Sequence, residues 1–396
     1  MTRHYEELDS LRGLGAFTVI WCHFLGCYPL DTAWLWIFTD TPLAVLRAGN
    51  EGIVFFFLLS GFVLSFSFLS EKKKPHYLPY LAKRVFRLYP AYLVAVFAAF
   101  LVKLCFFDGP IPGYSNEWIN RHWMQPGTWK IFTEHLPLIT RFKTSYLNPP
   151  VWSLVVEMRI SLIFPLLMVL FLKFRTRAVA SAAILSILSG YTCFYLKENG
   201  GNKDLQSLLD TLSFVSFFLM GAYLACTRKQ LMDGLLSLST LQRRALVLAG
   251  LLLYTNDLWI SCRWITAFAP QAVLLNKPPL TNFITSIGAS IILIWAISVP
   301  SFLSHKLVYF FGKISYSMYL WHMVALYGCI ATLHKYFAIW QVWIFAFAAT
   351  VALSTLSFYG VELPTMRLGR KLADALERWI APRAKPSLVE AALDRP

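Results

Sequence analysis

The chain has 396 residues, of which 57% are hydrophobic and 16% aromatic, while only 14% are charged. Soluble proteins carry about 25% charged residues, so this composition excludes an ordinary water-soluble globule. The formal net charge is +15. In a soluble chain that charge would suggest a nucleic-acid partner, but in so apolar a chain the basic residues must first be compared with a membrane topology.

Long apolar stretches decide the fold class. A helix needs about 20 mostly apolar residues to cross the hydrocarbon core of a bilayer. In lipid the backbone polar groups must be satisfied within each segment, and no alternating strand pattern suggests a barrel. We therefore predict an all-α integral membrane protein, a polytopic bundle of about ten transmembrane helices. The predicted spans are 11–30, 51–70, 90–107, 151–172, 178–196, 209–227, 244–262, 282–300, 314–333 and 338–360.

The basic residues predict the orientation of this bundle. If the N-terminus is cytoplasmic, the inner segments hold 24 of the 36 Lys and Arg residues and the outer segments hold ten. The remaining two, Lys103 and Arg159, lie within spans. This bias follows the positive-inside rule and predicts that both termini are cytoplasmic. The first apolar run has acidic residues before it and no clear cleavage site after it, so it is expected to remain as a helix.

Two segments outside the spans have distinct compositions. The longest connection, 108–150, is predicted to lie outside and contains a moderately apolar piece at 128–140. Charges and Pro137 interrupt that piece, which favours an interfacial or re-entrant helix over an eleventh span. Residues 367–396 form a basic amphipathic tail, expected on the inner membrane surface. We therefore predict one transmembrane domain, 1–366, followed by this cytoplasmic tail.

The seven cysteines form no C-x-x-C pair. They predict neither a disulfide framework nor a zinc site, and no metal is expected.

Ionisable residues inside spans are costly, so they are functional candidates by default. Arg12 and His23 are 11 residues apart, which places them on nearly the same helix face, about 16 Å apart along the axis. The arrangement links an anion-binding position near the inner mouth with a titratable base deep in the bundle. A snorkelling arginine and a hydrogen-bonded interhelical histidine would give the same pattern.

A second basic group precedes the third span. Residues 72–74 are lysines that topology alone explains, whereas Arg84 and Arg87 share one helix face at i, i+3. Two neighbouring guanidinium groups suit the phosphate oxygens of a lipid headgroup or of a soluble ligand.

The fourth and ninth spans carry further polar residues. Glu157 and Arg159 are about 200° apart on a helix, so they are not expected to pair. Glu157 then needs another partner, with His23, a substrate hydroxyl or a neighbouring helix as the alternatives. Ser315, Tyr319 and His322 fall on one stripe at i, i+4, i+7, where they either line a polar cavity or pack as an aromatic helix contact.

Five ordered stretches carry a resemblance to a known family. They are Leu8-Asp9-Ser10-Leu11-Arg12-Gly13 with His23; Phe56 to Phe62, which includes Ser60; Arg84-x-x-Arg87-x-x-Pro90; Trp152-Ser153-Leu154-x-x-Glu157; and Ile314 to His322. Together with Glu362-x-Pro364 they resemble the membrane-bound acyltransferase 3 family over essentially the whole chain. Members of that family carry acyl groups, most often acetyl from acetyl-CoA, to hydroxyl groups of envelope carbohydrates.

The resemblance implies roles for individual residues. His23 would be the catalytic histidine, with Glu157 at the family's acidic position. Arg12, Arg84 and Arg87 would hold the phosphates of the acyl-CoA donor. Asp9, Ser60, Trp152, Ser315, Tyr319 and His322 are further candidates for substrate contact or cavity lining. Arg159 departs from the family pattern, which has Glu or an apolar residue there in many members.

These expectations combine into one mechanism. The arginines at the inner mouth bind cytoplasmic acetyl-CoA, and His23 acts as general base on an acceptor hydroxyl, with Glu157 orienting the histidine. The expected partners are acyl-CoA, a carbohydrate acceptor and membrane lipids, without nucleic acid, in a bacterial cytoplasmic membrane. Alternatives are a succinyl or longer acyl donor, a relay through a protein side chain, a carrier or flippase for anionic or lipid-linked substrates, and a haem-binding electron carrier using His23 and His322.

Overall fold

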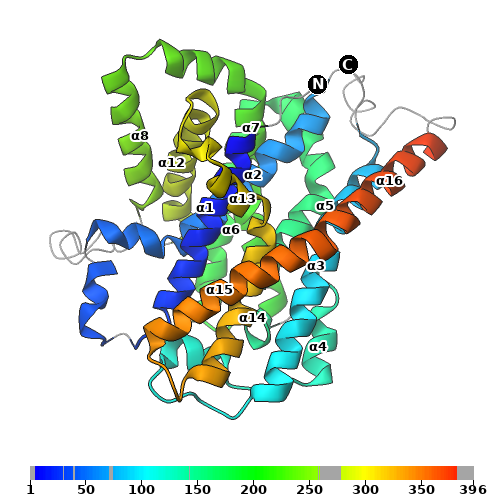
Figure 1. The fold of residues 1–396 in the computed structure, drawn as a ribbon. Helices are drawn as coiled ribbons and strands as arrows, with labels where there is room; N and C mark the ends of the chain where they lie inside the picture. The colour runs from blue at the N-terminus through cyan, green and yellow to red at the C-terminus, as the bar shows by residue number, and fades with distance from the viewer. Residues whose placement is uncertain are drawn as a thin grey trace.

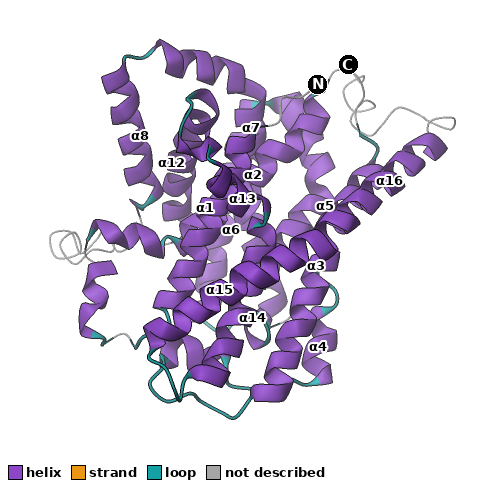
Figure 2. Ribbon diagram, viewed as in Figure 1, coloured by secondary structure: helices purple, strands orange, loops and turns teal. Residues whose placement is uncertain are grey.

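In the computed structural model of the protein, the ranges 5–29, 31–38, 41–70, 75–141, 143–256, 258 and 278–380 are described. Helices joined by loops make up these residues, and they contain no strand (Figure 2). The predicted all-α membrane architecture is confirmed. The longer helices are α1 (Glu6–Leu25), α2 (Gly49–Leu69), α3 (Tyr77–Phe106), α5 (Val151–Phe174), α6 (Thr176–Glu198), α7 (Lys203–Ser237), α8 (Thr240–Tyr254), α12 (Pro278–Ser298), α14 (Ser315–Leu333), α15 (Ile339–Ser357) and α16 (Leu363–Ile380).

Each of the ten predicted spans overlaps one of these helices. In the described part of the chain, seven helices are long and apolar enough to cross a membrane: α2, α3, α5, α6, α7, α12 and the continuous helix Ile339–Ile380. The other three predicted spans fall on α1, α8 and α14, and the end of the span at 244–262 lies outside the described residues. A total of ten spans therefore stays a prediction.

Two helices are much longer than their predicted spans. Helix α3 begins at Tyr77 rather than at residue 90 and includes Pro90. Helix α7 has 35 residues, about 52 Å at 1.5 Å per residue, which exceeds the hydrocarbon thickness. Hydropathy detects only the apolar part of a helix, so it misses polar turns that continue beyond the lipid.

The helix continues across residues 366 and 367, where the transmembrane domain was predicted to end. Helices α15 and α16 join through a turn at Phe358–Glu362 into one helix that crosses the bundle diagonally (Figure 1). Helix α16 packs on the first half of α3, where Gly369 approaches Phe86. The basic segment 367–380 is thus part of the folded bundle, and 381–396 lies outside the described residues.

Helices α2 and α7 cross with their backbones in direct contact. A Cβ atom added at Gly61 would lie 2.1 Å from the carbonyl oxygen of Phe218, and one at Gly221 would lie 2.1 Å from that of Leu58. Glycine is required at both positions because any side chain would separate the helices. Small residues at such crossings are typical of membrane bundles.

The connection between α3 and α5, residues 107–150, covers the end of the bundle where α1 finishes (Figure 1). We call it the outer segment, after its predicted side of the membrane. It contains a short turn, η3 (Asn116–Asn120), and α4 (Trp129–His135), whose seven residues are too few to cross a membrane. Helix α3 anchors it: Tyr92 Oη donates to the carbonyl of His135 at 2.6 Å, and buried Lys103 Nζ donates to that of His122 at 2.9 Å.

Candidate active site

A cavity of about 240 Å³ lies between α1, α2, α3, α5 and α14. Its wall combines an apolar part with polar residues that the sequence analysis selected. These selected residues are Arg12, Ser60, Arg84, Arg87, Glu157, Ser315 and Tyr319, and Ser153, which was not selected, also lines the cavity. Residues more than 300 positions apart in the chain therefore meet in one place.

Glu157 has partners other than the predicted His23. Its carboxylate forms an ion pair with Arg84 and accepts a hydrogen bond from Ser60 Oγ at 2.8 Å. Arg84 is only 7% exposed, and its Nε also donates to Ser161 Oγ at 2.9 Å. Of the alternatives for Glu157, the described contacts favour a neighbouring helix, because its carboxylate pairs with residues of α3 and α2.

The other two arginines differ in how far their charges are offset. Arg12 Nη1 pairs with Asp9 at 2.7 Å, one turn earlier on α1. Arg87 makes no ion pair with any described residue and donates only to Met366 Sδ at 3.6 Å. Buried Glu362 attracts Arg87 only at longer range, so the guanidinium group at the cavity wall keeps N–H donors for an anionic ligand.

His23 pairs with a second histidine. Its Nδ1 lies 2.8 Å from Nε2 of His322, and the two rings are nearly parallel, with centroids 5.1 Å apart. His322 Nδ1 lies 3.2 Å from the carbonyl oxygen of Met318. A carbonyl only accepts, so His322 Nδ1 carries the proton and the neutral ring accepts at Nε2. His23 must then donate through Nδ1, which leaves the lone pair on its Nε2 available as a base.

The outer segment completes the surroundings of His23. The indole of Trp118 stacks on the His23 ring with centroids 4.9 Å apart and an interplanar angle of 15°. Trp118 also packs against His122. Sequence reasoning missed this contact, since tryptophan in a long loop has no local signal for packing on a distant helix.

Tyr319 lies between the cavity and the histidine pair. Its ring contacts His322, with centroids 5.9 Å apart, and also lines the cavity. Its hydroxyl hydrogen-bonds with Ser153 Oγ at 2.7 Å and donates to the Pro150 carbonyl at 2.9 Å. His23 and His322 are not among the cavity-lining residues, so Tyr319 is the residue that contacts both the cavity and the histidine pair.

Two selected positions have different surroundings from those expected. Trp152 lines a second pocket on the other side of α5 and packs against Phe214. Glu362, from the Glu-x-Pro motif, is buried and accepts a hydrogen bond from Ser317 Oγ at 2.8 Å, which joins α14 to the turn before α16. Both contribute to packing around the site rather than to the cavity itself.

Metal ligation receives no geometric support in the part of the chain that the structure describes, where no group of three or more His, Cys, Asp or Glu residues could hold an ion. The site is instead a set of cations and hydrogen-bonded imidazoles. Such a set suits anion binding and proton transfer.

Comparison with known proteins identifies relatives along most of the chain. The chain is 23% identical over 387 residues to nodulation protein 10 of Rhizobium leguminosarum bv. viciae, covering 93% of this chain and 95% of that protein. It is 25% identical over 391 residues to the O-acetyltransferase OatA of Staphylococcus aureus strain NCTC 8325 / PS 47, covering 93% of this chain but only 58% of OatA. No solved structure matches the chain significantly.

The sequence model of one family, described as an acyltransferase domain, matches residues 5–359. That range includes the arginine cavity, the histidine pair and the outer segment. The chain therefore belongs to this acyltransferase family and is a membrane-embedded acyltransferase.

Proposed function

We propose that the protein transfers an acetyl group from cytoplasmic acetyl-CoA to a hydroxyl group of a cell-envelope or secreted carbohydrate. The observation that carries the proposal is the arginine-lined cavity adjacent to the His23–His322 pair. The name of OatA, an O-acetyltransferase, supports acetyl as the group. We further propose ten spans with both termini in the cytoplasm of a bacterium, which places the mouth at Arg12 inside.

The charges of the cavity support a donor with phosphate groups. Arg87 lacks a carboxylate partner among the described residues, and Arg12 lies near it at the inner end of α1. Phosphate oxygens would pair with these guanidinium groups. The apolar wall, with Phe56, Phe57 and Leu154, suits the flexible arm of the donor. At about 240 Å³ the cavity is smaller than usual sites for whole drug-sized ligands, so the arm, rather than the nucleotide, would fill it.

The histidine pair supports general base catalysis. His23 Nε2 takes the proton of the acceptor hydroxyl as that oxygen forms a bond to the thioester carbonyl carbon. The carbon–sulfur bond then breaks, the CoA sulfur leaves with its electron pair, and His23 returns the proton to it. His322 keeps His23 in the required tautomer through the 2.8 Å hydrogen bond. The acceptor would arrive from the side of Trp118, while the donor arm passes Tyr319 from the cavity.

The test compares surface glycans from cells that express the wild-type protein and the His23→Ala variant. Mass spectrometry would show O-acetyl esters on the wild-type glycans, and their loss in the variant at equal membrane abundance. His334→Ala is the matched control, because His334 follows α14 and its ring hydrogen-bonds only to the carbonyl of Ile330 among described residues. Undiminished ester content with His23→Ala would contradict the assignment, and the mass of the ester would identify the acyl group.

A further inference from the structure

A second pocket, also about 240 Å³, lies between the outer segment and the adjoining ends of α5, α6 and α7. We call it the outer pocket. Basic side chains from all four elements line it, against a single carboxylate. The basic residues are Arg141, Arg159, Lys197 and Lys203, and the acidic one is Asp210.

Helix α5 separates the two pockets. Trp152, Val155, Val156 and Arg159 line the outer pocket, whereas Ser153, Leu154 and Glu157 line the arginine cavity. At about 100° per residue these two sets lie on opposite faces of the helix. Arg159, which has no role in the proposed acetyl transfer, is therefore directed into a separate site.

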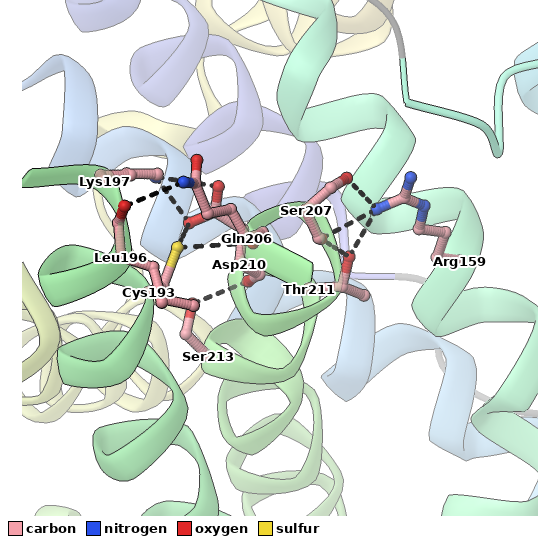
Figure 3. A network of polar contacts seen from close by, with 9 residues as sticks. All are labelled: Arg159, Cys193, Leu196, Lys197, Gln206, Ser207, Asp210, Thr211 and Ser213. Carbon is pink, nitrogen blue, oxygen red and sulfur yellow. Dashed lines mark hydrogen bonds and ion pairs between the residues drawn. The ribbon is translucent and has the colours of Figure 1, made fainter. Parts of the chain in front are cut away.

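The hydrogen bonds of Arg159 hold its guanidinium group in place without forming an ion pair. Nε donates to the Ile139 carbonyl at 2.8 Å, and Nη1 donates to Ser207 Oγ and Thr211 Oγ1 at 2.9 and 3.0 Å (Figure 3). None of these acceptors is a carboxylate. Nη2 donates to no described residue, so it is available to a ligand.

Of the other three cations in the outer pocket, two form ion pairs and one does not. Both oxygens of Asp210 bind Lys197 Nζ at 2.9 Å (Figure 3), and Arg141 pairs with Asp204 at 2.6 Å. Lys203 makes no hydrogen bond or ion pair with the residues that the structure describes. Arg159 and Lys203 are thus two charges outside any ion pair of the described residues, although Asp210 attracts Arg159 at longer range. They lie beside the first turns of α7, where the positive end of the helix dipole adds to their field.

We propose that the outer pocket binds a phosphate group at the outer face of the membrane that holds the protein. A phospholipid or a lipid-linked acceptor would carry this phosphate. A preorganised guanidinium group with a free N–H, a nearby free ammonium group and a helix N-terminus are the donors that phosphate oxygens prefer. Arg159 lies eight residues into α5, about 12 Å along its axis. The acceptor role depends on the proposed function, whereas phosphate binding does not.

The test measures binding to the full-length protein in detergent, without any acyl donor. Three probes distinguish the sources of phosphate: dihexanoyl-phosphatidylglycerol, farnesyl phosphate and inorganic phosphate, each at constant ionic strength. Lys203→Ala removes one charge from an exposed position. Arg159→Gln removes the other, and its amide nitrogen takes the place of Arg159 Nε, which donates to the Ile139 carbonyl. Lys130→Ala, an exposed lysine of α4 outside the pocket, is the matched control.

Each pocket variant is expected to bind the probes about tenfold more weakly, with Lys130→Ala unchanged. Tighter wild-type binding of phosphatidylglycerol would identify a phospholipid, tighter binding of farnesyl phosphate a lipid-linked carrier, and equal binding of all three recognition of phosphate alone. Affinities of Lys203→Ala and Arg159→Gln that equal those of the control would overturn the proposal. Because no acyl transfer is measured, a failure of the proposed function would not affect this result.

Discussion

Replacement of His322 tests whether one imidazole sets the tautomer of the other. His322→Phe keeps an aromatic ring of similar size but removes the acceptor for His23 Nδ1–H. His322 is fully buried, so water cannot replace the lost partner. Leaving a buried donor unsatisfied costs about 1–3 kcal/mol. If this cost falls on the transition state, kcat decreases by a factor of about 5 to 150.

The assay is CoA release from saturating acetyl-CoA by the protein reconstituted with acceptor glycan. We expect kcat to fall while KM for acetyl-CoA stays the same, because His322 does not line the arginine cavity. His322→Gln retains an acceptor oxygen on a side chain of comparable reach and is expected to recover part of the rate.

Thermal stability of both variants separates positioning from packing. A positioning role predicts that Gln and Phe differ in kcat although their melting temperatures are similar. A kcat within twofold of wild type for His322→Phe would refute the tautomer argument. Equal losses of rate for Phe and Gln, in proportion to lost stability, would show that His322 acts through packing alone.

Three further predictions follow from other contacts. Arg87→Ala is expected to raise KM for acetyl-CoA about tenfold with little change in kcat, measured in the same assay, since Arg87 forms no ion pair with a described residue. Gly61→Val is expected to destabilise the protein by several kcal/mol, measured by thermal unfolding in detergent, because its Cβ would lie 2.1 Å from the Phe218 carbonyl oxygen. Burial lowers the pKa of His122 and of His135. Below about pH 6.5 the unfolded outer segment therefore binds more protons than the folded one, and the free energy of unfolding falls on acidification. The decrease is at most about 1.4 kcal/mol per pH unit for each histidine. Limited proteolysis of the outer segment at pH 7 and pH 5 would measure this, and equal rates would contradict it.

The sequence was sufficient to predict the class of fold and the charged residues of the cavity wall. Apolar length locates helices because a bilayer demands about 20 such residues, and each predicted span overlaps a helix of the structure. The spacing of Arg84 and Arg87 also indicates a common helix face, and both residues line the cavity. These features depend only on the periodicity of one helix.

The side-chain contacts between helices could not be predicted from the sequence. Glu157 had several possible partners, and the choice of Arg84 and Ser60 depends on how α5 packs against α2 and α3. The His23–His322 contact joins residues 299 positions apart, and no local pattern reports such a distance. The same limit applies to Trp118, because its stacking on His23 requires the outer segment to fold back over α1.

Helix α5 shows why Arg159, which departs from the family pattern, leaves the contacts of nearby Glu157 undisturbed. Glu157 and Arg159 are two residues apart but face opposite sides of the helix, so neither can neutralise the other. The carboxylate is committed to Arg84 in the arginine cavity, and the guanidinium group is held by Ser207 and Thr211 on α7. A substitution at 159 can therefore alter what binds in the outer pocket while the contacts of Glu157 stay intact. Binding of phosphate probes and turnover of acetyl-CoA should accordingly respond to different faces of one helix.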